Sequence, residues 1–199
     1  MKSNICKITN GISDLAAILN ESAKVAVYNE LDHKQTLQLR LLCEELDGML
    51  PELIEEFEGD FWIEFEQSVC KVNVSIKLDD MDADKKSELV EISKSKKNAA
   101  ATGIVGKIRS LVEDLYFNKD AYLAYSASPE PFESSAVYPN AVTYSYYWSL
   151  EQYKYTVKQE NKEDAWDELE KSVISSVADD VIVGVKGKTV DIVIVKNFA

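Results

Sequence analysis

Residues 33–57 carry the longest amphipathic pattern in the sequence. Its apolar residues recur at spacings of three or four, the period of a helix with one buried face: Leu39, Leu42, Leu46, Met49, Leu53 and Phe57. Residues 32–35 have the form of a capping box, which begins such a helix. Pro51 falls inside the pattern, so we expect the helix to kink or divide there and to end at Gly59-Asp60. The apolar stripe requires another layer of structure to cover it.

Period-two alternation supplies that layer. Five segments have the pattern of strands or the length of a short edge strand, three in the first 78 residues and two in the last 19: residues 4–9, 61–66, 72–78, 181–185 and 190–195. We expect four further helical segments: residues 14–28 after an N-cap at Ser13, about 83–93, 104–115 and 150–178. Close spacing joins the middle pair of strands and the last pair as antiparallel hairpins. The order predicts an α/β (α+β) two-layer sandwich, a mostly antiparallel mixed sheet with helices on one face.

Residues 118–149 differ from the rest of the chain. They contain three of the four prolines and many of the tyrosines, with little periodicity. We interpret them as an irregular aromatic-rich insertion in a single domain covering residues 1–199, because 199 residues is the length of one domain. The aromatic residues at its end could form an exposed recognition patch, but we favour packing that completes the core: Tyr144, Tyr146, Tyr147, Trp148 and Tyr153.

Charge and composition exclude several classes of protein. Lys and Arg number 22 and Asp and Glu 35, so the formal net charge is −13, which disfavours nucleic acid as a partner. No apolar run approaches the roughly 18 residues that span a bilayer, and the first residues lack the pattern of a signal peptide. Three widely spaced cysteines, Cys6, Cys43 and Cys70, are typical of reduced thiols. We expect a cytoplasmic protein.

Few residues suit nucleophilic or zinc chemistry. His33 is the only histidine and has no nucleophile near it in sequence, so we expect a solvated residue at a helix start. Cys43 lies among leucines in the amphipathic stripe, which favours a buried, unreactive thiol. No His/Cys cluster has the spacing of a structural zinc site.

An acidic cluster after the second strand is a candidate Ca²⁺ site. Five carboxylates occupy positions 1, 3, 5, 9 and 12 of an EF-hand loop: Asp80, Asp82, Asp84, Glu88 and Glu91. Lys85 stands where that loop needs glycine, and the preceding element reads as a strand rather than a helix. The alternative is a set of carboxylates that cap a helix, which the helix dipole favours.

A further set of motifs occurs in a characteristic order. Residues 41–49 lie on the long helix, two strands and an acidic strand end follow, and Thr102-Gly103-Ile104-Val105-Gly106 opens the next helix. This order resembles the histidine-kinase-like ATPases, which include gyrase and the anti-sigma-factor kinases. The resemblance covers most of residues 33–115 and the terminal hairpin. In that family an E-x-x-x-N motif supplies a catalytic Glu and an Asn that holds Mg²⁺; Glu44 falls on the Glu, and Gly48 on the Asn.

The resemblance extends to the nucleotide-binding motifs, with departures. Asp80 matches the adenine-reading Asp of the D-x-G-x-G motif, while Asp82 and Asp84 stand at its glycines. Gly103 and Gly106 are similar to the phosphate loop, with one residue too many between them, and Thr189 to the Gly-Thr before the last strand. Each added carboxylate beside a triphosphate costs on the order of a few kcal/mol at an effective dielectric of about 20.

These departures decide the functional expectation. The resemblance implies a degenerate ATPase fold that acts as a non-catalytic regulatory module binding a protein partner, by analogy with anti-sigma factors, with no cofactor. The alternative is an ATP- or ADP-binding protein with Mg²⁺, or a weak serine kinase, with Glu44 as base and Asp80 on the adenine. Ca²⁺ binding is the third possibility. The sequence does not reveal the oligomeric state.

Overall fold

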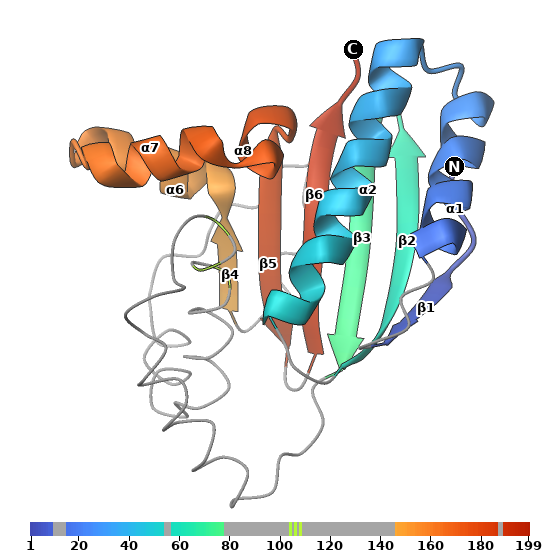
Figure 1. The fold of residues 1–199 in the computed structure, drawn as a ribbon, viewed down its shortest axis with the longest axis horizontal. Helices are drawn as coiled ribbons and strands as arrows, with labels where there is room; N and C mark the ends of the chain where they lie inside the picture. The colour runs from blue at the N-terminus through green and yellow to red at the C-terminus, as the bar shows by residue number, and fades with distance from the viewer. Residues whose placement is uncertain are drawn as a thin grey trace, which may run out of the picture.

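The computed structural model describes residues 1–9, 15–53, 57–77, 104, 106, 108, 146–186 and 189–199. In this part of the chain, an antiparallel six-stranded sheet is covered on one face by helices, as the ribbon in Figure 1 shows. The predicted two-layer α+β sandwich is confirmed.

Every neighbouring pair in the sheet is antiparallel, and the strand order is β1-β2-β3-β6-β5-β4. The strands are β1 (Cys6–Thr9), β2 (Glu58–Glu66), β3 (Val69–Lys77), β4 (Tyr146–Ser149), β5 (Asp180–Lys186) and β6 (Thr189–Asn197). Gln67 and Ser68 join β2 to β3 with φ of 48° and 71°, the backbone of a tight two-residue hairpin turn. The two predicted hairpins therefore lie side by side, because β3 pairs with β6.

Helices α1 (Leu15–Tyr28) and α2 (His33–Leu53) cross the helix-covered face. The capping box that opens α2 is formed: Gln35 N–H donates to Asp32 Oδ1 (2.8 Å), and Asp32 N–H to Gln35 Oε1 (2.9 Å). Of the two expectations for Pro51, a kink or a division, the division is wrong, because α2 continues through this residue to Leu53.

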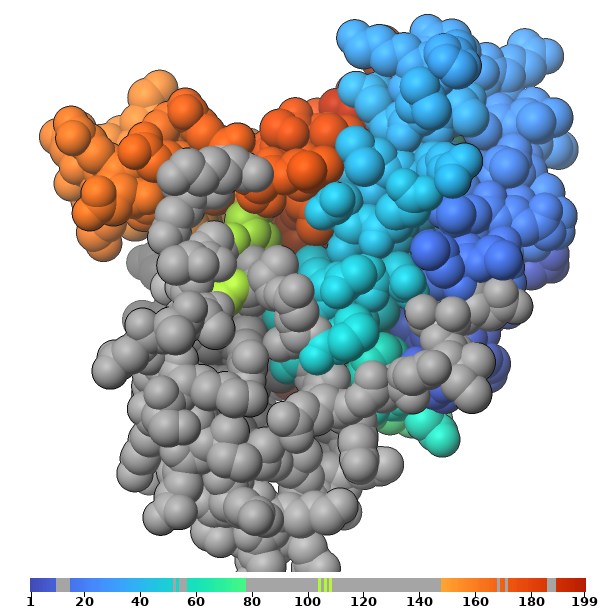
Figure 2. Space-filling model, viewed as in Figure 1, coloured from blue at the N-terminus to red at the C-terminus, as the bar shows by residue number. Residues whose placement is uncertain are grey.

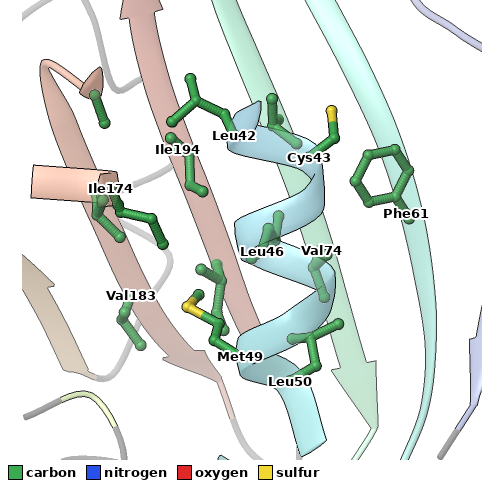
Figure 3. Packing of buried hydrophobic residues seen from close by; sticks show 14 of the residues in the cluster. Leu42, Cys43, Leu46, Met49, Leu50, Phe61, Val74, Ile174, Val183 and Ile194 are labelled. Carbon is green, nitrogen blue, oxygen red and sulfur yellow. The ribbon is translucent and has the colours of Figure 1, made fainter. Parts of the chain in front are cut away.

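The stripe of α2 packs on the sheet and makes the core. All six residues of the predicted stripe are buried, and Figure 3 shows Leu42, Leu46 and Leu50 against the strands. The sheet contributes the inward-facing residues of four strands: Phe61, Ile63, Val72, Val74, Val181, Val183, Val190, Ile192 and Ile194. Ile104 and Ile108 join the same cluster, and both have helical backbone, as the predicted helix over 104–115 requires.

Gly59 and Asp60 do not end a helix, contrary to the sequence-based expectation. Both belong to β2, which begins at Glu58. A side chain at Gly59 would meet the backbone oxygen of Ser75 on the neighbouring strand, since a Cβ built there lies 2.7 Å from it. The glycine therefore permits a close approach of β2 to β3, and is not a helix stop.

The expected single helix over residues 150–178 is three helices: α6 (Leu150–Gln159), α7 (Glu163–Lys171) and α8 (Val173–Val177). Asn161, with φ of 50°, turns the chain between α6 and α7, and Ser172 caps α8 by accepting a hydrogen bond from Ser175 N–H (3.3 Å). The last four residues of the expected irregular insertion form β4. Trp148 there is buried, which confirms core packing for this residue.

Several expectations concern residues outside the described part of the chain. These are the helix over 83–93, the Ca²⁺ candidates Asp80, Asp82, Asp84, Glu88 and Glu91, and residues 118–145 of the insertion.

A left-handed residue ends α1. Glu30 has φ of 53°, Leu31 N–H donates to Ala26 O (3.0 Å), and Glu30 N–H to Val27 O (3.2 Å). This pair of bonds is the Schellman arrangement, in which glycine is the preferred left-handed residue because it has no Cβ.

We expect Glu30→Gly to stabilise the protein by up to about 1 kcal/mol, because it removes the steric cost of the left-handed backbone. Thermal unfolding followed by circular dichroism measures the change, about 2–4 °C in melting temperature. Glu30→Ala is the control, since it removes the carboxylate and keeps the Cβ. An equal gain from both variants would refute the backbone explanation.

Hydrogen bonds to Glu21 of α1 hold the N-terminal segment in place. The residue is 6% exposed, and its carboxylate accepts hydrogen bonds from the Asn4 backbone N–H (3.1 Å), the Asn4 side chain (3.2 Å) and Lys24 Nζ (2.5 Å). The hydrogen bond from Lys24 holds the pKa of Glu21 below its ordinary value; burial opposes this effect and Asn4 assists it.

We expect Glu21→Gln to destabilise the protein at pH 7 by about 1 to 2 kcal/mol, because charge-assisted hydrogen bonds are lost. A lowered folded-state pKa stabilises above the ordinary value of 4.5 and loses that contribution as pH falls further. The difference from wild type should therefore shrink below pH 4.5 in urea unfolding. Glu66→Gln, at an exposed carboxylate, is the control and should show little effect at either pH. A Glu21→Gln deficit independent of pH would contradict the assignment.

Candidate functional site

Helix α2 carries two of the candidate site residues on its flank. Its inward face is occupied by the core residues, and Figure 3 shows Cys43 and Leu46 directed at the strands. Glu44 follows Cys43 and is partly exposed, with Oε1 accepting a hydrogen bond from Arg40 Nε at 2.9 Å. The candidate general base is thus paired with a cation one turn earlier on its own helix.

Gly48 lies one turn after Glu44 and is exposed. A Cβ built there has no atom within 4 Å, so the position has room for a side chain, although glycine has none. Glycine offers no side-chain oxygen to a metal ion. In the histidine-kinase-like ATPases that the sequence resembles, the residue at this position holds Mg²⁺. In this chain the position provides no side-chain ligand.

The end of the sheet near Gly48 gathers further candidates. Figure 1 shows the C-terminal half of α2, the end of β3 and the start of β6 at the same end of the sheet. Thr189 is the first residue of β6 and is in register with Lys77, the last residue of β3. The order of elements thus brings Thr189 to this end of the sheet.

The side chain of Thr189 nevertheless lies on the other face from α2. Val190 is fully buried under the helices, and successive strand residues point to opposite faces. The structure therefore does not bring the hydroxyl of Thr189 together with Glu44. Gly106 has helical backbone and is buried, between the core residues Ile104 and Ile108. Asp80 and Gly103 lie outside the described residues.

The remaining candidates behave as structural residues. His33 is exposed in the first turn of α2, as expected. Cys43 and Cys70 are both buried. Burial raises the pKa of the Cys43 thiol well above its ordinary value, with Cys70 and Glu44 adding to the effect, and burial raises the pKa of Cys70 to about 12. Both thiols are therefore protonated and unreactive at neutral pH.

Exposed apolar side chains are a feature that the sequence reading missed. On α1, Val27 is 80% and Tyr28 72% exposed, and on α6 Tyr155 is 67% exposed. Ala23, Lys24, Val27 and Tyr28 line one shallow hollow of the described surface, and residues 161–165 another. The sequence of α1 could have indicated this exposed apolar surface, because its 14 residues contain Glu21 and Lys24 as their only charged residues. A helix with so few charges is apolar on more than one face.

Comparisons with known proteins identify no relative: no protein-family model, curated protein or solved structure matches the chain. Within the described ranges, no three His, Cys, Asp or Glu side chains are grouped so that they could hold a metal ion. Among those same residues, no helix combines the length and the apolar character needed to cross a membrane.

We expect Gly48→Ala to stabilise the protein by about 1 kcal/mol, because alanine is favoured over glycine inside a helix and the site has room. Gly59→Ala is the matched substitution at a crowded position and should destabilise by about 1 to 3 kcal/mol. Urea unfolding of the two variants measures both signs. Destabilisation by Gly48→Ala would mean that α2 is more crowded at this position than the structure has it.

Proposed function

We propose that the protein is a non-catalytic regulatory module that binds another protein, built on a degenerate histidine-kinase-like ATPase scaffold. The observation that carries the proposal is the state of the two motif positions on α2. Glu44 is held by Arg40, and Gly48 has no side chain with which to hold a metal ion. Catalysis by this helix would need a free carboxylate and a metal ligand one turn away.

The order of elements supports the scaffold. A long helix packs across an antiparallel sheet, two strands follow it, and a terminal hairpin lies beside them. The sequence resemblance placed its motifs on that helix, after those two strands and before the last strand. Fold-level analogy of this kind supports a scaffold and not an activity.

The helices after β4 support protein binding. Figures 1 and 2 show α6 and α7 projecting as an arm beyond the sheet. Tyr155 on α6 is 67% exposed, and Trp166 on α7 is also exposed, with Nε1 donating to Glu170 Oε1 (2.8 Å). Exposed aromatic side chains are enriched at protein interfaces. The net charge of −13 attracts partners with a basic surface.

A pull-down from native cells with the full chain as bait tests the proposal. We expect a protein that wild type retains to be lost by Tyr155→Asp, because a charge replaces an exposed aromatic contact. Tyr28→Asp is the matched control, at an equally exposed tyrosine on α1, and should retain the protein. If the Tyr155→Asp variant retains the protein as well as wild type does, binding through the arm would be contradicted.

Nucleotide binding is the second candidate, and the gathering of α2, β3 and β6 at one end of the sheet favours it. Calorimetric titration with ADP and Mg²⁺ distinguishes the two. The proposal predicts no binding in the micromolar range. Micromolar affinity that Asp80→Ala abolishes would reject the degenerate interpretation in favour of an adenine site. A melting temperature raised by Ca²⁺ would instead favour the acidic cluster as an ion site.

A further inference from the structure

Two tryptophans of the chain make the same hydrogen bond to a neighbouring carboxylate. On β2, Trp62 Nε1 donates to Glu64 Oε1 at 2.8 Å. On α7, Trp166 Nε1 donates to Glu170 Oε1, also at 2.8 Å. Residues two apart on a strand, or four apart on a helix, point to the same side, so each carboxylate lies beside its own indole ring. The chain therefore contains two tryptophan–carboxylate pairs of one kind.

The pair on β2 holds a cation. Lys2 Nζ lies 4.6 Å from the centre of the Trp62 ring and 3.2 Å from Glu64 Oε1. The ammonium group thus contacts the ring and a carboxylate at once, a cation–π contact supported by an ion pair. The indole hydrogen bond is compatible with this contact, because the N–H lies at the edge of the ring and the cation binds the face.

The pair on α7 holds no such cation. In the part of the chain that the structure describes, no cation lies over the Trp166 ring and none forms an ion pair with Glu170. Lys162, the residue before α7, is paired with Glu160 at 2.5 Å. Figure 1 marks the N-terminus on the opposite side of the sheet from α7, so Lys2 serves β2 alone. Trp166 is 38% exposed and Glu170 is exposed, so this pair is accessible to a cation from another molecule.

The surface around Trp166 favours a cation. Glu163 and Asp167 are three residues before it and one after it, so with Glu170 they occupy one face of the helix. Neither Glu163 nor Asp167 forms an ion pair with any residue that the structure describes. Carboxylates three or four residues apart repel each other, and Glu170 in the last turn opposes the helix dipole. A bound cation would relieve both effects.

Carboxylates on the longer helices show the contrast. Glu21 on α1 lies 2.5 Å from Lys24, and Glu44 on α2 lies 2.9 Å from Arg40, so each has a cation within one turn. The nine residues of α7 instead include five carboxylates and one lysine. The excess negative charge of α7 is therefore available to a partner.

The chemistry of the pair decides which cation fits. Among the described residues, no three His, Cys, Asp or Glu side chains are grouped to hold a metal ion. An aromatic ring beside one carboxylate instead suits an organic cation, an ammonium or a guanidinium group. Nucleic acids and anionic lipids would be repelled by the carboxylates of α7. The occupant that fits is a basic side chain of a protein.

We propose that Trp166 and Glu170 bind an arginine or lysine side chain of the protein partner, as Trp62 and Glu64 bind Lys2. The cation stacks on the indole ring and pairs with the carboxylate, and the neighbouring carboxylates of α7 attract further basic residues of the same segment. This inference rests on the proposed protein-binding function, and it makes the segment that contacts α7 a basic one.

A titration of the full ¹⁵N-labelled chain with a synthetic amphipathic peptide of alanine, leucine and arginine tests the site. The chain has three tryptophans, so the indole N–H signal of Trp166 is the one that Trp166→Phe removes. We expect this signal to shift saturably, and the signal of Trp62 to stay in place because Lys2 already occupies its ring. The same peptide with uncharged citrulline in place of arginine should shift neither signal. A Trp166 signal that the arginine peptide does not move would overturn the proposal.

The affinity of variants for the arginine peptide gives a second readout. Glu170→Gln keeps an acceptor for the indole N–H and removes the charge, so it should weaken binding about three- to fivefold, the effect of one exposed ion pair. Glu66→Gln is the control, at an exposed carboxylate on β2, and should leave the affinity nearly unchanged. Equal losses from both variants would overturn the proposal, because general attraction to an acidic chain would then account for the binding.

The pull-down separates this inference from the function on which it rests. A captured protein that depends on Tyr155 and not on Glu170 would leave the protein-binding function standing and overturn the cation site. A saturable shift of the Trp166 signal without any captured protein would support the cation site and count against the function.

Discussion

The packing of α2 on the sheet holds the structure together. A helix of 21 residues is about 32 Å long, and a strand of nine residues about 30 Å, so α2 is about as long as the strands β2, β3 and β6 that it crosses. Its buried residues meet inward-facing residues of those strands and of β5 in one cluster. α1 and α8 then pack against α2, so the helical layer is organised around it.

The same packing determines what α2 offers to a ligand. Leu42, Cys43 and Leu46 are committed to the core, which leaves Glu44 and Gly48 on the flank of the helix. One is paired with Arg40 and the other has no side chain, so the helix can keep its structural role without contributing catalytic groups.

The periodicity of apolar residues predicted the buried core correctly. Residues taken as helix ends, or missed as such, predicted the bounds of the helices less well. The stripe of α2 and the alternation in β3 and β6 identified buried residues because burial imposes a period. Gly59 looked like a helix stop, and only its approach to Ser75 reveals a strand position. The break at Asn161 depends on one residue tolerating left-handed backbone. Alternation from Val190 already implied that Thr189 faces away from α2, whereas the pairing of Glu44 with Arg40 needed side-chain geometry.

We propose that α2 and its neighbouring strand ends form a scaffold without a nucleotide site. Titrating ¹⁵N-labelled protein with Mg²⁺ and ADP, while following backbone amide signals, tests it residue by residue. We expect that the amide signals of Glu44, Gly48 and Thr189 do not shift at millimolar nucleotide. Saturable shifts confined to those three amides and the end of β3 would contradict it.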